Sequence, residues 1–228
     1  KDVTDFEHND YNMNSVGTGP YKLVEYQSGS YLKFEANENY YKGEPSIKNV
    51  VFQIIENADT AILALQNGEV DAYQMTPQQV KKLDLDASNL STYSYSEGRV
   101  GYLEINCNRV TDEKVRKALL YAMDRKAMDD AAFESSEYYS IPYTFLPTNS
   151  QFYTEDGVEK YEQDVDKAKS MLEDAGVSGL KLKLGYMSSD AVQSAQALLI
   201  QEQLKEVGVT VELAGGDGTA IANAMKDP

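Results

Sequence analysis

The 228-residue sequence is poor in the residue types that carry out most covalent and metal chemistry, with one cysteine, one histidine and no tryptophan. Because Cys107 is the single cysteine, the chain can form neither an internal disulfide nor a cysteine-based metal cluster. A catalytic triad needs a base beside a nucleophile, and His8 lies in a polar N-terminal stretch without such a partner. The motifs G-x-S-x-G and H-E-x-x-H are also absent. We therefore expect no enzyme, no cofactor and no bound metal.

Positive charge is scarce as well. The chain has 21 Lys and Arg against 37 Asp and Glu, a formal net charge of −16. Nucleic-acid affinity comes largely from Lys and Arg contacts to phosphate, and anionic membranes attract basic segments. No apolar run approaches the roughly 20 residues of a membrane helix. The chain starts at Lys1 without an apolar leader, so we expect any targeting signal to lie outside these residues.

Tyrosine is the aromatic residue that is plentiful, with 17 Tyr against 6 Phe. Tyrosine combines a large apolar surface with a hydroxyl group, which suits adaptable polar binding surfaces. The alternative interpretation is that the high tyrosine content reflects a general amino-acid preference of the source, and the sequence favours neither interpretation.

The first part of the chain predicts mixed α/β structure. A Gly-rich turn precedes two alternating stretches, 21–26 and 31–36, which read as a hairpin. A strand over 47–55, a helix over 60–66 and a strand over 70–75 then follow. A strand, helix and strand in this order predict two parallel strands joined by a right-handed crossover.

The middle of the chain predicts two further strands and three helices. Thr76, Pro77 and Gln79 are a helix start signal for a short helix over 77–83. Alternation predicts strands over 90–96 and 99–106. Thr111 or Asp112 caps an amphipathic helix, and Asp124 caps a second helix over 125–133.

The last third returns to α/β alternation after an irregular, Tyr- and Pro-rich stretch, 135–149. We interpret that stretch as the crossing between a first lobe, residues 1–143, and a second lobe, residues 144–228. The second lobe is predicted to begin with a helix over 165–175, capped by Asp164, and a strand over 180–186. A long helix capped by Ser189 or Asp190 and ending at 207, a strand over 209–213 and a helix over 219–225 are predicted to follow.

Four stretches of the sequence, in this order, carry a resemblance to one protein family. They are Gly17–Leu23 (GTGPYKL) with Asn39–Gly43 (NYYKG), Ala64–Asp71 (ALQNGEVD), Gly101–Arg125, and Ala168–Gly176 (AKSMLEDAG) with Leu204–Val211. The chain resembles the extracytoplasmic solute-binding proteins, family 5, of bacterial ABC importers in the oligopeptide, dipeptide and nickel class.

The resemblance implies a fold of the periplasmic-binding-protein type, with two α/β lobes that close on a ligand by a hinge. It implies capture of oligopeptides or dipeptides outside the membrane and delivery to a membrane permease, by a monomer in the periplasm or by a lipid-anchored protein at the cell surface. Nickel complexes and short glycans are alternative ligands. Because family members are usually longer, the chain reads as a middle fragment. A sensory or adhesion module on the same fold, or a hydrolase, are the alternative functions.

Ligand contacts in a two-lobed α/β protein are expected in the cleft, at strand ends and crossings. Two places qualify: the strand that leads towards the hinge, and the crossing between the lobes. Backbone groups at a strand edge can pair with an extended peptide. The alternative is that the tyrosines of the crossing only pack the linker. The predicted ligand-binding residues are Arg99, Gly101, Tyr102, Tyr138, Tyr139 and Tyr143.

Overall fold

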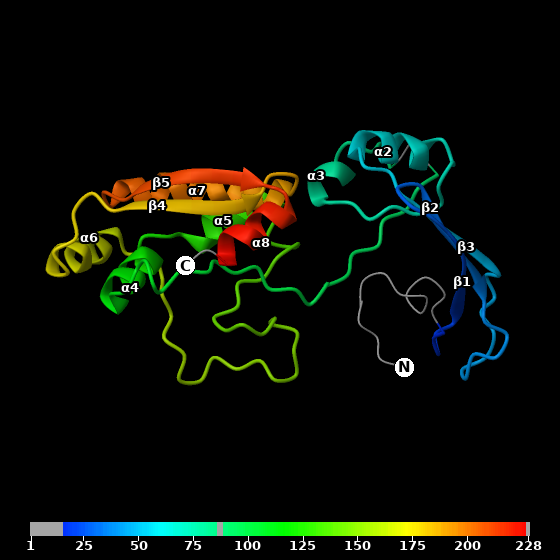
Figure 1. Ribbon diagram of the computed structural model, residues 1–228, viewed down its shortest axis with the longest axis horizontal. Helices are drawn as coiled ribbons and strands as arrows, with labels where there is room; N and C mark the ends of the chain where they lie inside the picture. Colours follow the sequence, from blue (N-terminus) through cyan, green and yellow to red (C-terminus); the bar gives the residue numbers. More distant parts are fainter. Residues whose placement is uncertain (1–15, 86–88, 227–228) are drawn as a thin grey trace. The chain divides into compact units, whose positions relative to one another are not determined.

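The computed structural model of the chain describes residues 16–85 and 89–226 (Figure 1). The chain divides into two compact units, one up to Gln74 and one from Met75 onward. His8 lies outside the described residues. The predicted boundary between lobes at residue 143 refers to a two-lobed protein and stays a prediction, because the division at Gln74 concerns contacts within this chain alone.

The first unit contains an antiparallel sheet of three strands in the order β1-β2-β3. β1 (Tyr21–Gln27) and β2 (Tyr31–Ala36) form the predicted hairpin, with an irregularity in register next to Leu23. β3 (Asn49–Gln53) is shorter than the predicted strand and pairs with β2. Register places Phe34 beside Val50 and next to Phe52, whose ring it meets edge-on at 5.6 Å. The sheet is therefore amphipathic, with aromatic and aliphatic side chains gathered on one face.

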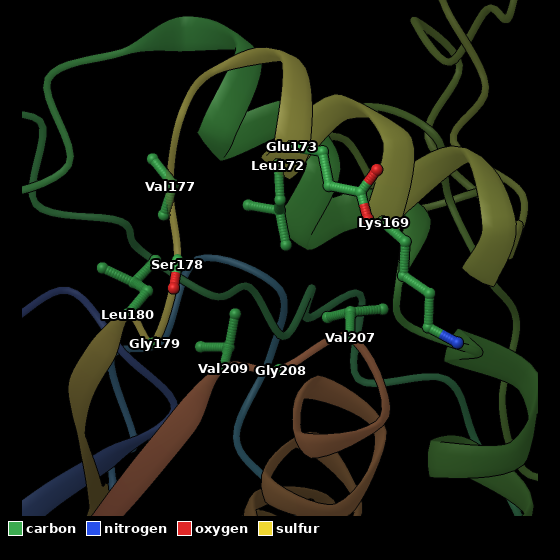
Figure 2. Close-up of a pocket in the computed structure, with 10 residues that line it drawn as sticks. All are labelled: Lys169, Leu172, Glu173, Val177, Ser178, Gly179, Leu180, Val207, Gly208 and Val209. Atoms are coloured by element: carbon green, nitrogen blue, oxygen red, sulfur yellow. The ribbon is translucent and has the colours of Figure 1, made fainter.

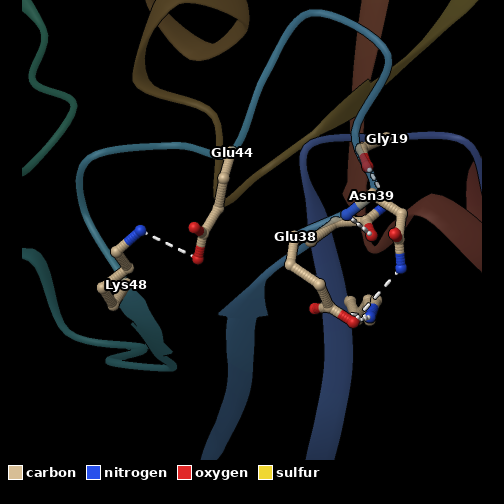
Figure 3. A network of polar contacts seen from close by, with 7 residues as sticks. Gly19, Glu38, Asn39, Glu44 and Lys48 are labelled. Carbon is tan, nitrogen blue, oxygen red and sulfur yellow. Dashed lines mark hydrogen bonds and ion pairs between the residues drawn. The ribbon is translucent and has the colours of Figure 1, made fainter.

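The Gly-rich turn and the NYYKG stretch meet at Asn37, which is buried. The Asn37 side chain donates from Nδ2 to the Gly19 carbonyl at 3.1 Å, and its N–H donates to the Pro20 carbonyl at 2.8 Å. Figure 3 shows the surrounding polar contacts, which include an ion pair of 2.8 Å between Lys48 and Glu44. Two sequence stretches 18 residues apart are thus joined by one buried amide.

The helix of the first unit, α2 (Ala58–Gln66), starts two residues earlier than predicted because Asn57 caps it from Oδ1 to the Thr60 N–H at 2.9 Å. The strand predicted over 70–75 is wrong. Gly68 turns the chain at φ +72°, and the N–H groups of Glu69 and Val70 donate back to the Ala64 carbonyl. Backbone N–H groups that donate to the last turn of a helix cannot also donate to a neighbouring strand. The parallel β-α-β arrangement predicted for this region does not form.

The second unit begins with α3 (Pro77–Val80), which has the predicted capping box between Thr76 and Gln79 but is three residues shorter than expected. The strands predicted over 90–96 and 99–106 are wrong for this structure. Both segments are extended, but neither pairs with another strand among the described residues. A strand needs a partner as well as an alternating pattern, and within the described part of the chain none is adjacent.

Two helices follow as predicted. α4 (Glu113–Tyr121) is capped by Asp112, and α5 (Arg125–Phe133) is capped by Asp124, whose Oδ1 accepts from the Ala127 N–H at 2.9 Å. The spacing of the apolar residues explains how α4 packs, since Val115, Ala118 and Leu119 are all buried.

The predicted second β-α-β arrangement is confirmed. β4 (Lys181–Met187) and β5 (Thr210–Gly216) are parallel, and α7 (Ala191–Glu206) connects them. The strands end one and three residues later than predicted. α6 (Val165–Asp174) packs on α4, and α8 (Gly218–Lys226) follows β5. Their shared core contains Val110, Val115, Leu119, Met123, Leu172, Leu204, Val209 and Val211. The fold is α/β, with the core of the second unit formed by helices packed on a parallel strand pair.

Candidate functional site

The start of α5 meets the predicted crossing at Tyr143. The Arg125 guanidinium lies over the Tyr143 ring, with Cζ 4.5 Å from the ring centroid, and Arg125 also donates to the Pro142 carbonyl at 3.1 Å. The Lys160 ammonium lies 4.6 Å from the same centroid. Two cations at one aromatic ring are attracted by its negative face. Arg125 therefore connects the crossing to the start of α5.

The polar end of Tyr143 is also occupied. Its hydroxyl donates to the Glu162 carboxylate, and this bond raises the pKa of the phenol above its usual range. The Tyr143 N–H donates to the Tyr153 hydroxyl at 3.2 Å, and that hydroxyl donates to Glu155 at 2.8 Å. The hydroxyl and the backbone N–H of Tyr143 therefore both have hydrogen-bond partners within the chain.

A pocket of about 300 Å³ opens beside this cluster. Its walls carry charges of both signs, from Arg125 and Lys126 against Asp124 and Glu162. Of the predicted site residues only Tyr143 lines it. Reasoning from the sequence missed Lys160 and Glu162, because no periodic pattern links residues 17 and 19 positions away from the tyrosine. The lining residues are Met123, Asp124, Arg125, Lys126, Ile141, Tyr143, Tyr161, Glu162 and Gln163.

Tyr138 and Tyr139 lie at the other end of α5. The Tyr139 hydroxyl donates to Asp130 Oδ1 at 2.7 Å, which raises the pKa of Tyr139, and its ring is 5.9 Å from that of Phe133. Lys126 and then Tyr139, both hydrogen-bonded to Asp130, lower the pKa of that carboxyl. Tyr138 is different, because 46% of it is exposed and no hydrogen bond of its hydroxyl is recorded among the described residues.

The two ends of α5 point to opposite ends of the parallel strand pair. Asp124 donates from its N–H to Gln203 Oε1 at 3.0 Å, near the end of α7, and Gln196 donates to Asp129 at 2.9 Å. α5 and α7 therefore run antiparallel. α7 runs from the carboxyl end of β4 to the amino end of β5. The C-terminal end of α5 therefore lies near the carboxyl ends of the strands, and Tyr138 follows that end of α5 in the sequence. In open α/β sheets ligands bind outside the carboxyl ends of the strands.

The other predicted residues occupy the extended segment before α4. Arg99 forms an exposed ion pair of 3.2 Å with Glu97, Gly101 is exposed, and Tyr102 is 78% exposed. The segment touches the crossing elsewhere, through a hydrogen bond of 3.0 Å from Asn149 Nδ2 to Ser96 Oγ. The structure does not gather the six predicted residues into one cavity, and their role in ligand binding stays a prediction.

A second pocket, of about 240 Å³, lies where α6 and α7 end (Figure 2). Leu172, Val207 and Val209 form its apolar floor, and the loop of Ser178 and Gly179 closes one side. It opens at the amino ends of β4 and β5, the side that ligands of α/β sheets do not use. We assign it no ligand.

No cluster of three or more His, Cys, Asp or Glu side chains suited to a metal occurs in residues 16–85 and 89–226. In the same residues no helix is both long and apolar enough to span a bilayer. The clusters described above hold aromatic rings, cations and carboxylates.

The chain is similar in sequence and in fold to known proteins. The profile of the bacterial extracellular solute-binding proteins, family 5 (middle part), matches residues 1–227. The oligopeptide-binding protein AppA of Bacillus subtilis is 30% identical over 99% of this chain, which corresponds to 44% of AppA. The solved structure of AppA with a nonapeptide superimposes with a TM-score of 0.67, at 27% identity over 92% of this chain and 44% of that one.

A second solved structure is more similar. The ABC transporter substrate-binding protein CtaP of Listeria monocytogenes superimposes with a TM-score of 0.83, at 37% identity over 98% of this chain and 46% of CtaP. The chain thus spans less than half the length of these relatives. Because the family profile covers nearly all of it, the chain belongs to the bacterial extracellular solute-binding proteins of family 5.

Proposed function

We propose that this chain is part of the substrate-binding component of an ABC importer, which captures oligopeptides or dipeptides outside the cytoplasmic membrane and delivers them to a permease. The observation that carries the proposal is the family match over residues 1–227, together with a relative of the same fold that holds a nonapeptide. Catalysis is not part of the proposal, since the family consists of solute-binding proteins. The protein acts as a monomer, in the periplasm or tethered to the cell surface by a lipid.

Binding is proposed to use aromatic side chains and backbone groups on both sides of a hinge. Tyr138, at the carboxyl side of the strand pair, and Tyr102, with most of its ring exposed, offer apolar surface to a peptide. Arg99 and the backbone at Gly101 offer donors to peptide carbonyls. Tyr139 and Tyr143 keep their hydroxyls on carboxylates and act mainly by holding the crossing in place. A ligand that contacts both lobes stabilises the closed state.

The proposal predicts that residues 1–228 alone bind peptide poorly, because they make up less than half the length of the relatives and would supply only part of a cleft. Isothermal titration calorimetry of this chain and of the full-length gene product against a pool of tri- to nonapeptides measures the difference. We expect binding by the full-length protein and at least roughly a hundredfold weaker binding by the chain, which is about 2.8 kcal/mol.

Two results would contradict the proposal. Equal affinity of the chain and the full-length protein would mean that residues 1–228 hold the whole site. Lack of binding by the full-length protein to any peptide, with binding of a nickel complex or a short glycan instead, would transfer the function to that ligand.

A further inference from the structure

We propose that Gln78 and Lys81 are positioning residues for ligand binding, because their contact with the C-terminal end of α5 fixes the turn that presents Tyr138 to a peptide. The inference rests on the proposed function, since it concerns how the Tyr138 ring reaches a ligand. Its starting point is Glu134, the last residue before the crossing. Glu134 has φ +63° and is the one residue other than glycine with a positive φ in the part of the chain that the structure describes.

Glu134 turns the chain at the end of α5. Its N–H still donates to the Asp130 carbonyl at 2.8 Å, but its left-handed backbone ends the helix. Such a backbone is usually found at glycine, and occasionally at asparagine, because a Cβ crowds the following carbonyl there. A glutamate keeps this conformation only where the surrounding structure holds it.

The contacts that hold Glu134 come from α3 and the residue after it, 53 and 54 positions earlier in the chain. The Gln78 side-chain amide donates to the Ala132 carbonyl, and the Lys81 ammonium forms an ion pair with the Glu134 carboxylate. Gln78 and Lys81 are three positions apart, which places them on the same side of a helical turn. The last carbonyls of a helix lack partners within the helix, and its C-terminal end favours a cation. Both contacts therefore supply what the end of α5 lacks.

The first residues of the crossing fold back on α5. The Tyr138 N–H donates to the Ser135 carbonyl at 3.2 Å, which closes a turn directly after Glu134. Tyr139 then packs against Phe133, with 5.9 Å between the ring centroids. This turn leaves 46% of Tyr138 exposed. Because Glu134 starts the turn, its backbone conformation decides where the Tyr138 ring projects.

The ion pair is expected to act on the local conformation rather than on the stability of the whole protein. The Lys81 side chain is 65% exposed and that of Glu134 is 38% exposed, and exposed ion pairs add little to the free energy of unfolding. A protein whose binding-competent conformation is only partly populated binds its ligand more weakly in proportion. The contact between α3 and α5 therefore acts on peptide affinity through the population of the turn that presents Tyr138.

Hydrogen–deuterium exchange of the full-length protein without peptide tests the contact. Lys81→Glu places two carboxylates opposite each other, so the amides of residues 134–139 should exchange about fivefold faster, at an unchanged melting temperature. Adding Glu134→Lys to Lys81→Glu restores an ion pair and should restore slow exchange. Lys181→Glu, at an exposed position of β4, is the control and should leave the turn unchanged. Exchange of residues 134–139 that Lys81→Glu does not accelerate would overturn the inference.

Gln78→Met tests the second contact. Methionine has a side chain of similar length but cannot donate to the Ala132 carbonyl, so residues 134–139 should again exchange faster, by about threefold. An effect of Lys81→Glu together with no effect of Gln78→Met would overturn the role of Gln78.

Calorimetry of the same full-length variants, with the pool of tri- to nonapeptides, connects the contact to binding. Lys81→Glu should weaken peptide binding about fivefold, and adding Glu134→Lys should restore the affinity. In a Tyr138→Ala background Lys81→Glu should cost less than about twofold, because the contact acts through that ring. Unchanged affinity of Lys81→Glu, or an equal loss in both backgrounds, would overturn the positioning role. If the unchanged full-length protein bound no peptide, the proposed function would be contradicted, whereas the exchange measurement would still test the contact.

Discussion

Asp129 on α5 carries a carboxyl group at the contact with α7. Its Oδ1 accepts from Gln196 Nε2 at 2.9 Å, and burial raises the pKa of the carboxyl above its usual range in spite of this bond. The folded protein therefore holds a proton at Asp129 more readily than the unfolded chain, whose carboxyl titrates near pH 3.9. The stability that this group contributes is fully present below about pH 3.9 and is lost as pH rises through the folded pKa.

Replacing Asp129→Asn keeps the acceptor for Gln196 and removes the charge. We expect the variant to melt higher than the unchanged protein at pH 7, by roughly 2 °C, with the gap closing at about pH 3. Thermal unfolding followed by circular dichroism between these pH values measures it. Glu202→Gln, at an exposed position of α7, is the matched control and should leave the melting temperature unchanged. A lower melting temperature for Asp129→Asn at pH 7 would contradict the assignment.

The tyrosines of the crossing separate into two roles at the residue scale. Tyr138 has an exposed ring, whereas Tyr143 lies between two cations and a carboxylate. In the full-length protein we expect Tyr138→Ala to weaken peptide binding about tenfold, or about 1.4 kcal/mol, at unchanged stability. Tyr143→Leu should instead cost about 1–2 kcal/mol of stability at nearly unchanged affinity. Calorimetry and urea unfolding on the same preparations measure both, and a loss of affinity from Tyr143→Leu alone would reverse the assignment.

At the scale of elements, α7 decides how the second unit packs. It crosses between β4 and β5 and also contacts α5, so apolar residues are needed on more than one side of it. Leu204 is 3% exposed, whereas Leu198 on the same helix is 55% exposed. The helix therefore contains a matched pair of leucines with different burial.

We expect Leu204→Ala to destabilise the chain by about 2–5 kcal/mol, because it removes buried methyl groups and leaves a cavity. Leu198→Ala should cost less than about 1 kcal/mol, since most of that side chain already contacts water. Urea unfolding followed by circular dichroism gives both values. Similar costs for the two substitutions would mean that α7 does not face the core as described.

Helices were the elements that could be predicted from the sequence. α5 has the predicted bounds, and α4 and α6 are capped by Asp112 and Asp164, two of the residues that the pattern indicated. A helix satisfies its own backbone, and a cap residue within three positions marks its start. The hairpin β1-β2 was predictable for a similar reason, because a short turn brings its two strands together.

The extended segments were not predictable in the same way. Strands are predicted from the sequence at 70–75, 90–96 and 99–106, but none of these segments forms a strand in this structure. A strand exists only where a second strand accepts its hydrogen bonds, and the partner can lie anywhere in the polypeptide. β4 and β5 do pair, because the connecting helix α7 places the second strand beside the first.

At the scale of the whole molecule, the proposed function requires closure around the ligand. The full-length protein should contract when it binds a peptide, because a ligand that touches both lobes favours the closed state. Small-angle X-ray scattering with and without saturating peptide would register a smaller radius of gyration. A short polyethylene glycol at the same concentration is the control and should leave the radius unchanged. An unchanged radius at saturating peptide would exclude closure as the response to binding.

The candidate site could be predicted only as a region. Sequence patterns indicated the crossing as an aromatic stretch, and Tyr139 and Tyr143 do contact residues of α5. The patterns could not tell that Tyr143 is held by Arg125 and Glu162, which are 18 and 19 positions away, while Tyr138 is exposed. Such contacts depend on how a long irregular segment folds back on a helix.

What the sequence by itself determined is the family, the α/β class, the capped helices and the hairpin, since each of these follows from local spacing or from motifs that stand in order along the chain. Only the tertiary structure decided which extended segments become strands and which tyrosines keep an exposed ring. The physical reason is the same for both: hydrogen-bond partners and stacking partners are set by residues far away in the chain, and local patterns carry no information about them.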